Sequence, residues 1–75
     1  MSEIQSLILQ NAYEHYIKTG RAYTCLYPSD VHERMNYQNA IQDLSDNGYI
    51  NLCGKPGIAM RIIEITFKGI DYISS

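Results

Sequence analysis

The sequence predicts an α+β fold, mainly α, in which helical segments precede a β-hairpin and a short helix ends the chain. Apolar residues recur at helical spacing within residues 3–19 and 37–47. Residues 49–53 and 58–65 instead form two short β-prone runs, separated by the turn sequence Gly54-Lys55-Pro56-Gly57. A chain of 75 residues has room for one hydrophobic core, so we expect a single domain spanning residues 1–75.

Composition and charge narrow the class of protein. The chain is 45% hydrophobic and 19% charged, which is typical of a globular domain and too apolar for a disordered one. No apolar run approaches the roughly 18 residues that a membrane span needs, and Met1-Ser2-Glu3 lacks the positive start of a signal peptide. We therefore expect a cytoplasmic protein with no membrane partner. The net charge of −2 counts against nucleic-acid binding, although the placement of charges matters more than their sum.

The first helix is expected to run from Glu3 to Thr19. Ser2 and Gln5 match a capping box at its start. One broad side of the helix is apolar and should face the core, and it contains Ile8, Leu9, Ala12, Tyr13, Tyr16 and Ile17. Ile4 and Leu7 fall toward the polar side, where they are either incidentally exposed or part of a partner surface.

The next segment is expected to contain a short strand and a short helix. Arg21 to Tyr27 is rich in β-forming residues, and Pro28 ends that run. Ser29 is a good cap for a second helix from Asp30 to Met35. Asn36 is then expected to serve both as a turn residue and as the cap of the helix that follows.

The helix from Tyr37 to Asn47 organises the rest of the prediction. Its inner face is expected to contain the residues at spacing i, i+3, i+4 and i+7, which are Tyr37, Ala40, Ile41 and Leu44. Gly48 is a good residue for ending it. Its solvent face should contain Gln38, Asn39, Gln42, Asp43 and Asp46. A short helix that stops at a glycine and leads into a strand is typical of the second helix of a helix-turn-helix unit.

The last third of the chain reads as a β-hairpin followed by a helix. Tyr49 to Cys53 and Ile58 to Ile65 are the predicted strands, and Thr66 is expected to cap a final helix from Phe67 to Ile73. If Ile63 and Ile65 point inward, the alternation of a strand turns a second set outward, namely Ile58, Met60, Ile62 and Glu64. A β-bulge, the final helix or a second subunit could account for the three apolar members of that set.

Reactive side chains do not form a pattern that predicts catalysis or metal binding. Cys25 and Cys53 have no metal-ligand spacing and are expected to be free thiols, with a disulfide or redox switch as the alternative. His15 and His32 have no partner at ligand spacing. The sequence contains no phosphate-binding glycine loop, nucleophile motif or paired carboxylates. We therefore expect no metal, no cofactor and no enzymatic activity.

Two patches of the sequence resemble a known superfamily. Ile41-x-x-Leu44-x-x-x-Gly48-x-Ile50 is similar to a recognition helix that leads into the first wing strand of the winged helix-turn-helix superfamily of bacterial and phage proteins. Ile65-Thr66-x-x-Gly69-x-x-Tyr72-Ile73 is similar to the ending that is common in that superfamily. The resemblance implies a winged helix with a three-helix core, a β-hairpin wing with its tip at Gly54–Gly57, and a short C-terminal helix.

The resemblance also implies a function, which is transcriptional regulation through duplex DNA by a homodimer. Carried over by position, the residues expected in the major groove are Tyr37, Gln38, Asn39 and Gln42. Lys55 would reach the DNA backbone or minor groove from the wing. Arg21 and Arg34 are candidates for additional phosphate contacts, although scattered solvated charge is the alternative interpretation of these cations.

One departure from the superfamily pattern supports a different hypothesis. Recognition helices commonly carry Arg or Lys on the exposed face, whereas this helix has Asp43 and Asp46 there. The alternative is a protein-interaction or adaptor module on the same fold that does not bind DNA directly. Its candidate interface residues are the apolar ones expected at the surface, namely Ile4, Leu7, Ile58, Met60 and Ile62.

Overall fold

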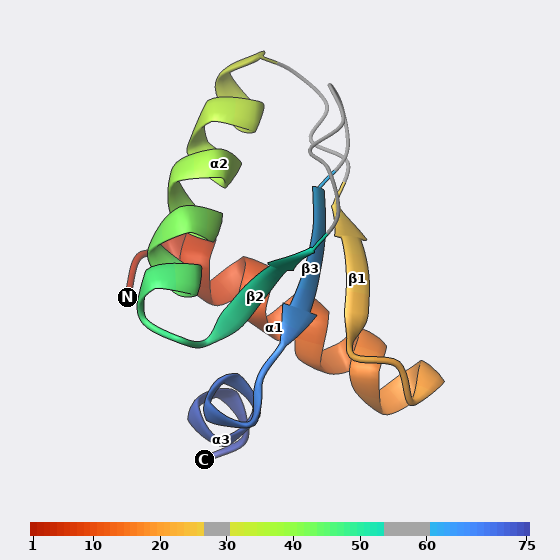
Figure 1. Ribbon diagram of the computed structural model, residues 1–75. Coiled ribbons are helices and arrows are strands. Elements are labelled where there is room, and N and C mark those ends of the chain that lie inside the picture. Colours follow the sequence, from red (N-terminus) through yellow and green to blue (C-terminus); the bar gives the residue numbers. More distant parts are fainter. Residues whose placement is uncertain (27–30, 54–60) are drawn as a thin grey trace.

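Three helices and one three-stranded antiparallel sheet make up the described part of the chain (Figure 1). The computed structural model describes residues 1–26, 31–53 and 61–75, and of residues 31–34 and 61 it describes the backbone alone. The elements follow the order α1 (Glu3–Thr19), β1 (Tyr23–Leu26), α2 (Val31–Asp46), β2 (Ile50–Cys53), β3 (Arg61–Ile65) and α3 (Phe67–Ser74). The predicted class, mainly helical α+β, is confirmed.

Helix α1 has the bounds that the sequence predicts. The Ser2 hydroxyl accepts from the Gln5 backbone N–H at 3.2 Å, and the Gln5 side-chain oxygen accepts from the Ser2 N–H at 3.2 Å, so the capping box is complete. Gly20 ends the helix in the left-handed region with φ of 73°. Ile8, Leu9 and Ala12 are buried, as their positions on the helix predict.

Helix α2 is continuous, so the predicted break at Asn36 is wrong. Residues 31–46 form one helix, where the sequence was expected to form two, Asp30–Met35 and Tyr37–Asn47. The physical reason is that no glycine or proline lies within residues 31–46. Asparagine alone costs only about 0.7 kcal/mol in a helix interior. The predicted cap Ser29 and the predicted first residue Asp30 lie outside the described residues.

The end of α2 is fixed by backbone hydrogen bonds. The Tyr49 N–H donates to the Leu44 carbonyl at 2.9 Å, and the Gly48 N–H donates to the Ser45 carbonyl at 3.0 Å. These two bonds are the Schellman pattern, which needs a left-handed residue, and Gly48 has φ of 81°. The predicted stop at Gly48 is therefore confirmed, and β2 begins two residues later.

The sheet has the strand order β1-β3-β2, with both neighbouring pairs antiparallel. The β2–β3 pair confirms the predicted hairpin, while its predicted turn at residues 54–57 and the predicted strand start at Ile58 lie outside the described residues. Strand β1 lies beside β3, a pairing that the sequence analysis did not assign. Glu64 of β3 faces Tyr23 on one side and Asn51 on the other.

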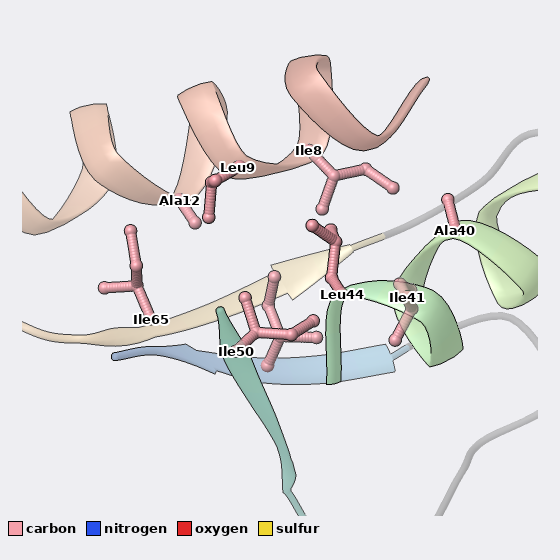
Figure 2. Packing of buried hydrophobic residues seen from close by; sticks show 9 residues of the cluster. Ile8, Leu9, Ala12, Ala40, Ile41, Leu44, Ile50 and Ile65 are labelled. Atoms are coloured by element: carbon pink, nitrogen blue, oxygen red, sulfur yellow. The ribbon is translucent and has the colours of Figure 1, made fainter. Parts of the chain in front are cut away.

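The hydrophobic core lies between one face of the sheet and the helices α1 and α2. Nine of the residues whose side chains are described are buried there: Ile8, Leu9, Ala12, Ala40, Ile41, Leu44, Ile50, Ile63 and Ile65. Figure 2 shows the α1 side chains pointing toward Leu44 and Ile65. Helix α3 adds the partly buried Ile70 and Ile73 at the side of this cluster. The described core is therefore two helices against a sheet, where the sequence analysis expected three helices.

Helix α3 is tied to the end of α2 by polar contacts. The Thr66 hydroxyl accepts from the Gly69 N–H at 3.2 Å, which caps α3 as predicted, and lies 2.9 Å from the Tyr49 carbonyl oxygen. The Lys68 ammonium donates to the Asn47 carbonyl at 2.5 Å and lies 4.7 Å from the centre of the Tyr49 ring. None of the described helices has both the length and the apolarity that crossing a membrane requires.

Candidate functional site

The solvent face of α2 is the surface that the DNA hypothesis needs. Gln38, Asn39 and Gln42 are exposed, as the sequence predicts. Tyr37 is half-buried and packs against the core, so only part of its side chain reaches solvent.

The carboxylates of Asp43 and Asp46 on this face accept hydrogen bonds from glutamine side chains. The Gln42 amide donates to the Asp46 carboxylate at 2.9 Å, and the Gln5 amide of α1 donates to the Asp43 carboxylate at 3.0 Å. Residues 35–46 contain neither lysine nor arginine. The described face is therefore negative, which opposes the approach of DNA phosphates.

The candidate cations are not brought together on this face. Arg21 is exposed and precedes β1, whereas α2 contacts β2 at the opposite edge of the sheet. The side chain of Arg34 and the whole of Lys55 lie outside the described residues. Lys68 already contacts the Asn47 carbonyl and the Tyr49 ring.

The candidate interface residues are spread over different parts of the fold. Ile4 is half-buried against the core, while Leu7 of α1 is 50% exposed. Ile62 is half-buried and lies on the face of the sheet that points away from the core. Ile58 and Met60 lie outside the described residues. The sequence set therefore does not form one patch among the described residues.

A different set of residues forms a continuous surface, which we call the outer face of the sheet. It consists of Tyr23, Cys25, Asn51, Cys53, Ile62 and Glu64. The strand register aligns them in two rows across the three strands, Cys25–Ile62–Cys53 and Tyr23–Glu64–Asn51. Burial alternates along the strands, as it does when successive side chains point to opposite faces of a sheet. Thr24 and Ile63 are buried on the core side, while Tyr23 and Cys25 are exposed.

Both long helices lie on the other side of the sheet. Helix α1 contacts β1 and β3, and α2 contacts β2, through the buried core residues. Figure 1 shows the strands in front of α1, with α3 below the end of β3. No described element therefore covers the outer face.

The charge on the outer face is that of Glu64. Its carboxylate accepts from the Asn51 amide at 3.2 Å. The negative charge of Glu64 raises the pKa of Tyr23, and a hydrogen bond between the two side chains acts in the same direction. Burial, and secondly the charge of Glu64, raises the pKa of the Cys53 thiol. The outer face therefore has a negative potential beside an apolar row.

The two thiols are free, as the sequence predicts. Cys25 and Cys53 both face Ile62 from the strands on either side of it. Two strand spacings of about 4.8 Å place their Cα atoms roughly 10 Å apart, beyond the limit of about 7 Å for a disulfide. A disulfide between them within one copy is therefore excluded by the register.

A hollow lies among the described residues where β3 leads into α3. Its volume is about 340 Å³, and its lining includes Tyr16, Ala22, Phe67 and Ile70. Asn51 and Glu64 supply polar groups but already bond to each other. Within residues 1–26, 31–53 and 61–75, no three His, Cys, Asp or Glu side chains gather closely enough to hold a metal ion.

Sequence reasoning identified only part of the outer face. Strand alternation predicted that Ile62 and Glu64 point outward if Ile63 and Ile65 point inward, and the structure meets that condition. It could not add Tyr23, Cys25 or Asn51, because the register that aligns them depends on which strands pair.

Comparison with known proteins yields no matching family model, curated protein or solved structure. The two surfaces described above therefore carry the functional argument.

Proposed function

We propose that this protein is a small protein-interaction module that docks its partner on the outer face of the sheet. One observation carries the proposal: the row Cys25–Ile62–Cys53 is accessible on a face that no described element covers. Covering such a row with an apolar partner side chain is favourable, at about 25 cal/mol per Å² of apolar surface removed from water. Tyr23, which borders the row, belongs to a residue type that is enriched at interfaces.

The chemistry of the outer face favours a partner segment that is amphipathic and basic. The apolar row runs beside Glu64, whose charge raises the pKa of both Tyr23 and Cys53. A Lys or Arg side chain opposite Glu64 would complement that charge, while apolar side chains would cover Ile62. The acidic net charge of the chain acts in the same direction at longer range.

The size of the outer face favours a single segment as the partner. Three strands about 4.8 Å apart, with four residues each at about 3.3 Å, span roughly 200 Å². A typical stable interface buries about 800 Å² on each partner. One helix or one extended peptide therefore fits this face better than a second globular domain, and we expect binding to be weak and reversible.

A peptide titration followed by the backbone amide NMR signals tests the proposal. The probe is a synthetic amphipathic peptide of leucine and lysine, and the matched control peptide has glutamate in place of lysine. We expect the lysine peptide to shift the signals of Cys25, Cys53 and Ile62, and the glutamate peptide to shift none of them. Shifts confined to α2 would show only nonspecific attraction to its acidic face and would overturn the proposal.

Substitutions on the protein sharpen the same titration. Ile62→Ser removes apolar surface and should weaken peptide binding severalfold. Glu64→Gln keeps the shape and removes the charge, so it should weaken binding by about fivefold or less, as expected for an exposed ion pair worth up to about 1 kcal/mol. Asn39→Ser on the exposed face of α2 is the control, and it should leave binding unchanged.

Binding of duplex DNA by a winged helix is the second candidate function. It is favoured by the order α2, β2, β3 and by the exposed amides Gln38, Asn39 and Gln42, which suit the edges of adenine bases. On this proposal a homodimer would place α2 in the major groove. Three phosphate contacts would give a salt slope of about −3.

DNA retention distinguishes the two candidates. If α2 binds DNA, random duplex at low salt should retain the protein, and Arg34→Ala and Lys55→Ala should each weaken retention. Ile62→Ser should then have no effect. If the outer face is the binding surface, the duplex should not retain the protein, and both cation substitutions should leave peptide binding unchanged.

A further inference from the structure

At one edge, which we call the free edge, β1 has backbone groups that pair with no described strand. The Ile65 N–H donates to the Ala22 carbonyl at 3.1 Å, which makes these residues a hydrogen-bonded pair of the antiparallel ladder. Because such pairs alternate along a ladder, Thr24 also bonds toward β3, whereas Tyr23 and Cys25 do not. The N–H and C=O groups of Tyr23 and Cys25 therefore point away from the sheet.

This edge lacks the features that usually keep strand edges from pairing. Residues 23–26 read Tyr-Thr-Cys-Leu and contain no charged residue and no proline. The β1–β3 register also runs without a bulge over all four residues. The opposite edge of the sheet belongs to β2, which α2 contacts. Among the described strands, β1 is therefore the one suited to accept another strand.

We propose that β1 pairs with β1 of a second copy of this chain, antiparallel and around a two-fold axis at Thr24. In that register Tyr23 faces Cys25 of the second copy, and Cys25 faces Tyr23 of the second copy. All four backbone groups at each edge then form hydrogen bonds. The product is a continuous six-stranded sheet, and this proposal holds whether or not the outer face docks a partner.

The side chains agree with a second copy as the occupant. Pairing in this register keeps inner residues opposite inner residues and brings no two like charges together, because residues 23–26 are uncharged. It also joins the outer faces of the two copies into one surface of about twice the area. A partner strand of unrelated sequence would ensure neither the pairing of inner with inner residues nor the absence of like charges.

Thr24 provides an independent observation in favour of the two-fold axis. Its side chain is 8% exposed, and its hydroxyl has no hydrogen-bond partner among the described residues. A buried hydroxyl without a partner is costly. A rotation about the Cα–Cβ bond of Thr24 can carry the hydroxyl to the position that the methyl group now holds. The two Thr24 hydroxyls can then bond to each other across the axis, since hydrogen-bonded Thr–Thr pairs between adjacent strands are stabilising.

The first test is a concentration series of the wild-type protein. Sedimentation should show a dimer that dissociates on dilution, because four residues of strand pairing give a small interface. Hydrogen exchange on the same samples should show the Tyr23 and Cys25 amides becoming protected as concentration rises. The amides of Ile50 and Leu52 at the β2 edge should stay unprotected. A monomer at all concentrations, or protection at the β2 edge alone, would overturn the proposal.

The second test fixes the register by disulfide formation. In a protein with Cys25→Ser and Cys53→Ser, Thr24→Cys should cross-link the dimer when glutathione disulfide is added, each new disulfide releasing two molecules of glutathione. Leu26→Cys is the matched control, because Leu26 of each copy would lie about four residues from the other along the strand. Equal cross-linking of both variants, or of Leu26→Cys alone, would overturn the register.

A milder substitution tests the role of the hydroxyl. Thr24→Val keeps the shape of the side chain and removes only its hydrogen-bonding group. We expect the dimer dissociation constant to rise by roughly fivefold, equivalent to about one hydrogen bond. An unchanged or tighter dimer would contradict the Thr24 contact.

Discussion

The two faces of β3 show how one strand can carry stability and recognition at once. Ile63 and Ile65 are 0% and 4% exposed and pack among α1, α2 and the neighbouring strands. Ile62 and Glu64 alternate with them, yet they lie on the face that no described helix covers. The difference lies entirely in the direction of the side chains. The inner face should therefore tolerate almost no substitution, whereas the outer face should tolerate many and lose binding instead.

The largest expected effect comes from shortening the same side chain on each face. Ile63→Ala should lower the free energy of unfolding by about 3 to 4 kcal/mol, because it leaves a cavity in the core. Ile62→Ala should lower it by about 1 kcal/mol or less. Urea unfolding of the two variants measures both values. Equal losses would mean that the outer face is as closely packed as the core, which would contradict the comparison.

The next effect tests how tightly α3 lies against the inner side. A methyl group added at Gly69 would overlap the Tyr49 carbonyl oxygen and press on Leu9 and Ile65. Gly69→Ala should therefore destabilise the fold by about 2 kcal/mol, although alanine favours a helix more than glycine does. Asp71→Ala, at an exposed position of the same helix, should change stability by less than about 0.5 kcal/mol. Thermal unfolding of both variants decides the point, and a stabilised Gly69→Ala protein would refute the close approach.

A smaller effect of opposite sign is expected at Thr24, which is the polar residue on the buried face of β1. Within one copy the hydroxyl has no hydrogen-bond partner among the described residues, so Thr24→Val should raise the free energy of unfolding of the monomer by about 1 kcal/mol. Denaturation should be measured at a concentration where sedimentation shows monomer. A destabilised monomer would show that the hydroxyl is hydrogen-bonded within one copy.

The smallest effect is a change in titration on the outer face. Glu64→Gln removes the main cause of the raised pKa of Tyr23, so the pKa should fall toward its ordinary value. A raised phenol pKa stabilises the fold below the ordinary tyrosine range, and this contribution is lost as the pH rises through the folded pKa. The difference in phenolate absorbance between each protein and its Tyr23→Phe variant isolates this group. If the pKa of Tyr23 is the same in both proteins, the charge of Glu64 does not act on the Tyr23 phenol, which would contradict this prediction.

The ends of helices and the side of a helix that faces the core could be predicted from the sequence, because they depend on residues that are close together in the chain. The capping box at Ser2, the stop at Gly48 and the burial of Ile8, Leu9 and Ala12 all follow from neighbouring residues. The break expected at Asn36 was wrong, because a residue that favours a helix cap does not interrupt a helix that the surrounding sequence continues. A capping preference needs a glycine, a proline or a lost apolar pattern beside it to end a helix.

The candidate site depended on contacts between distant parts of the chain. Nothing in the sequence near Tyr23 indicates that this residue lies opposite Glu64, which is 41 positions later in the chain. The reason why residue 69 is a glycine also depends on a distant residue, because the carbonyl oxygen of Tyr49 occupies the space that a side chain at this position would need. The outer face and the free edge of β1 therefore required the strand order, which propensity and periodicity do not supply.

The central claim is that the outer face of the sheet, and not the solvent face of α2, binds the partner. The most direct measurement is one amide-shift map recorded on the same protein with the leucine–lysine peptide and then with random duplex DNA. We predict that the peptide shifts the signals of Cys25, Cys53 and Ile62, and that DNA at about 50 mM salt shifts none of the signals of α2. DNA-induced shifts at Gln38, Asn39 and Gln42, with the outer face silent toward the peptide, would contradict the account.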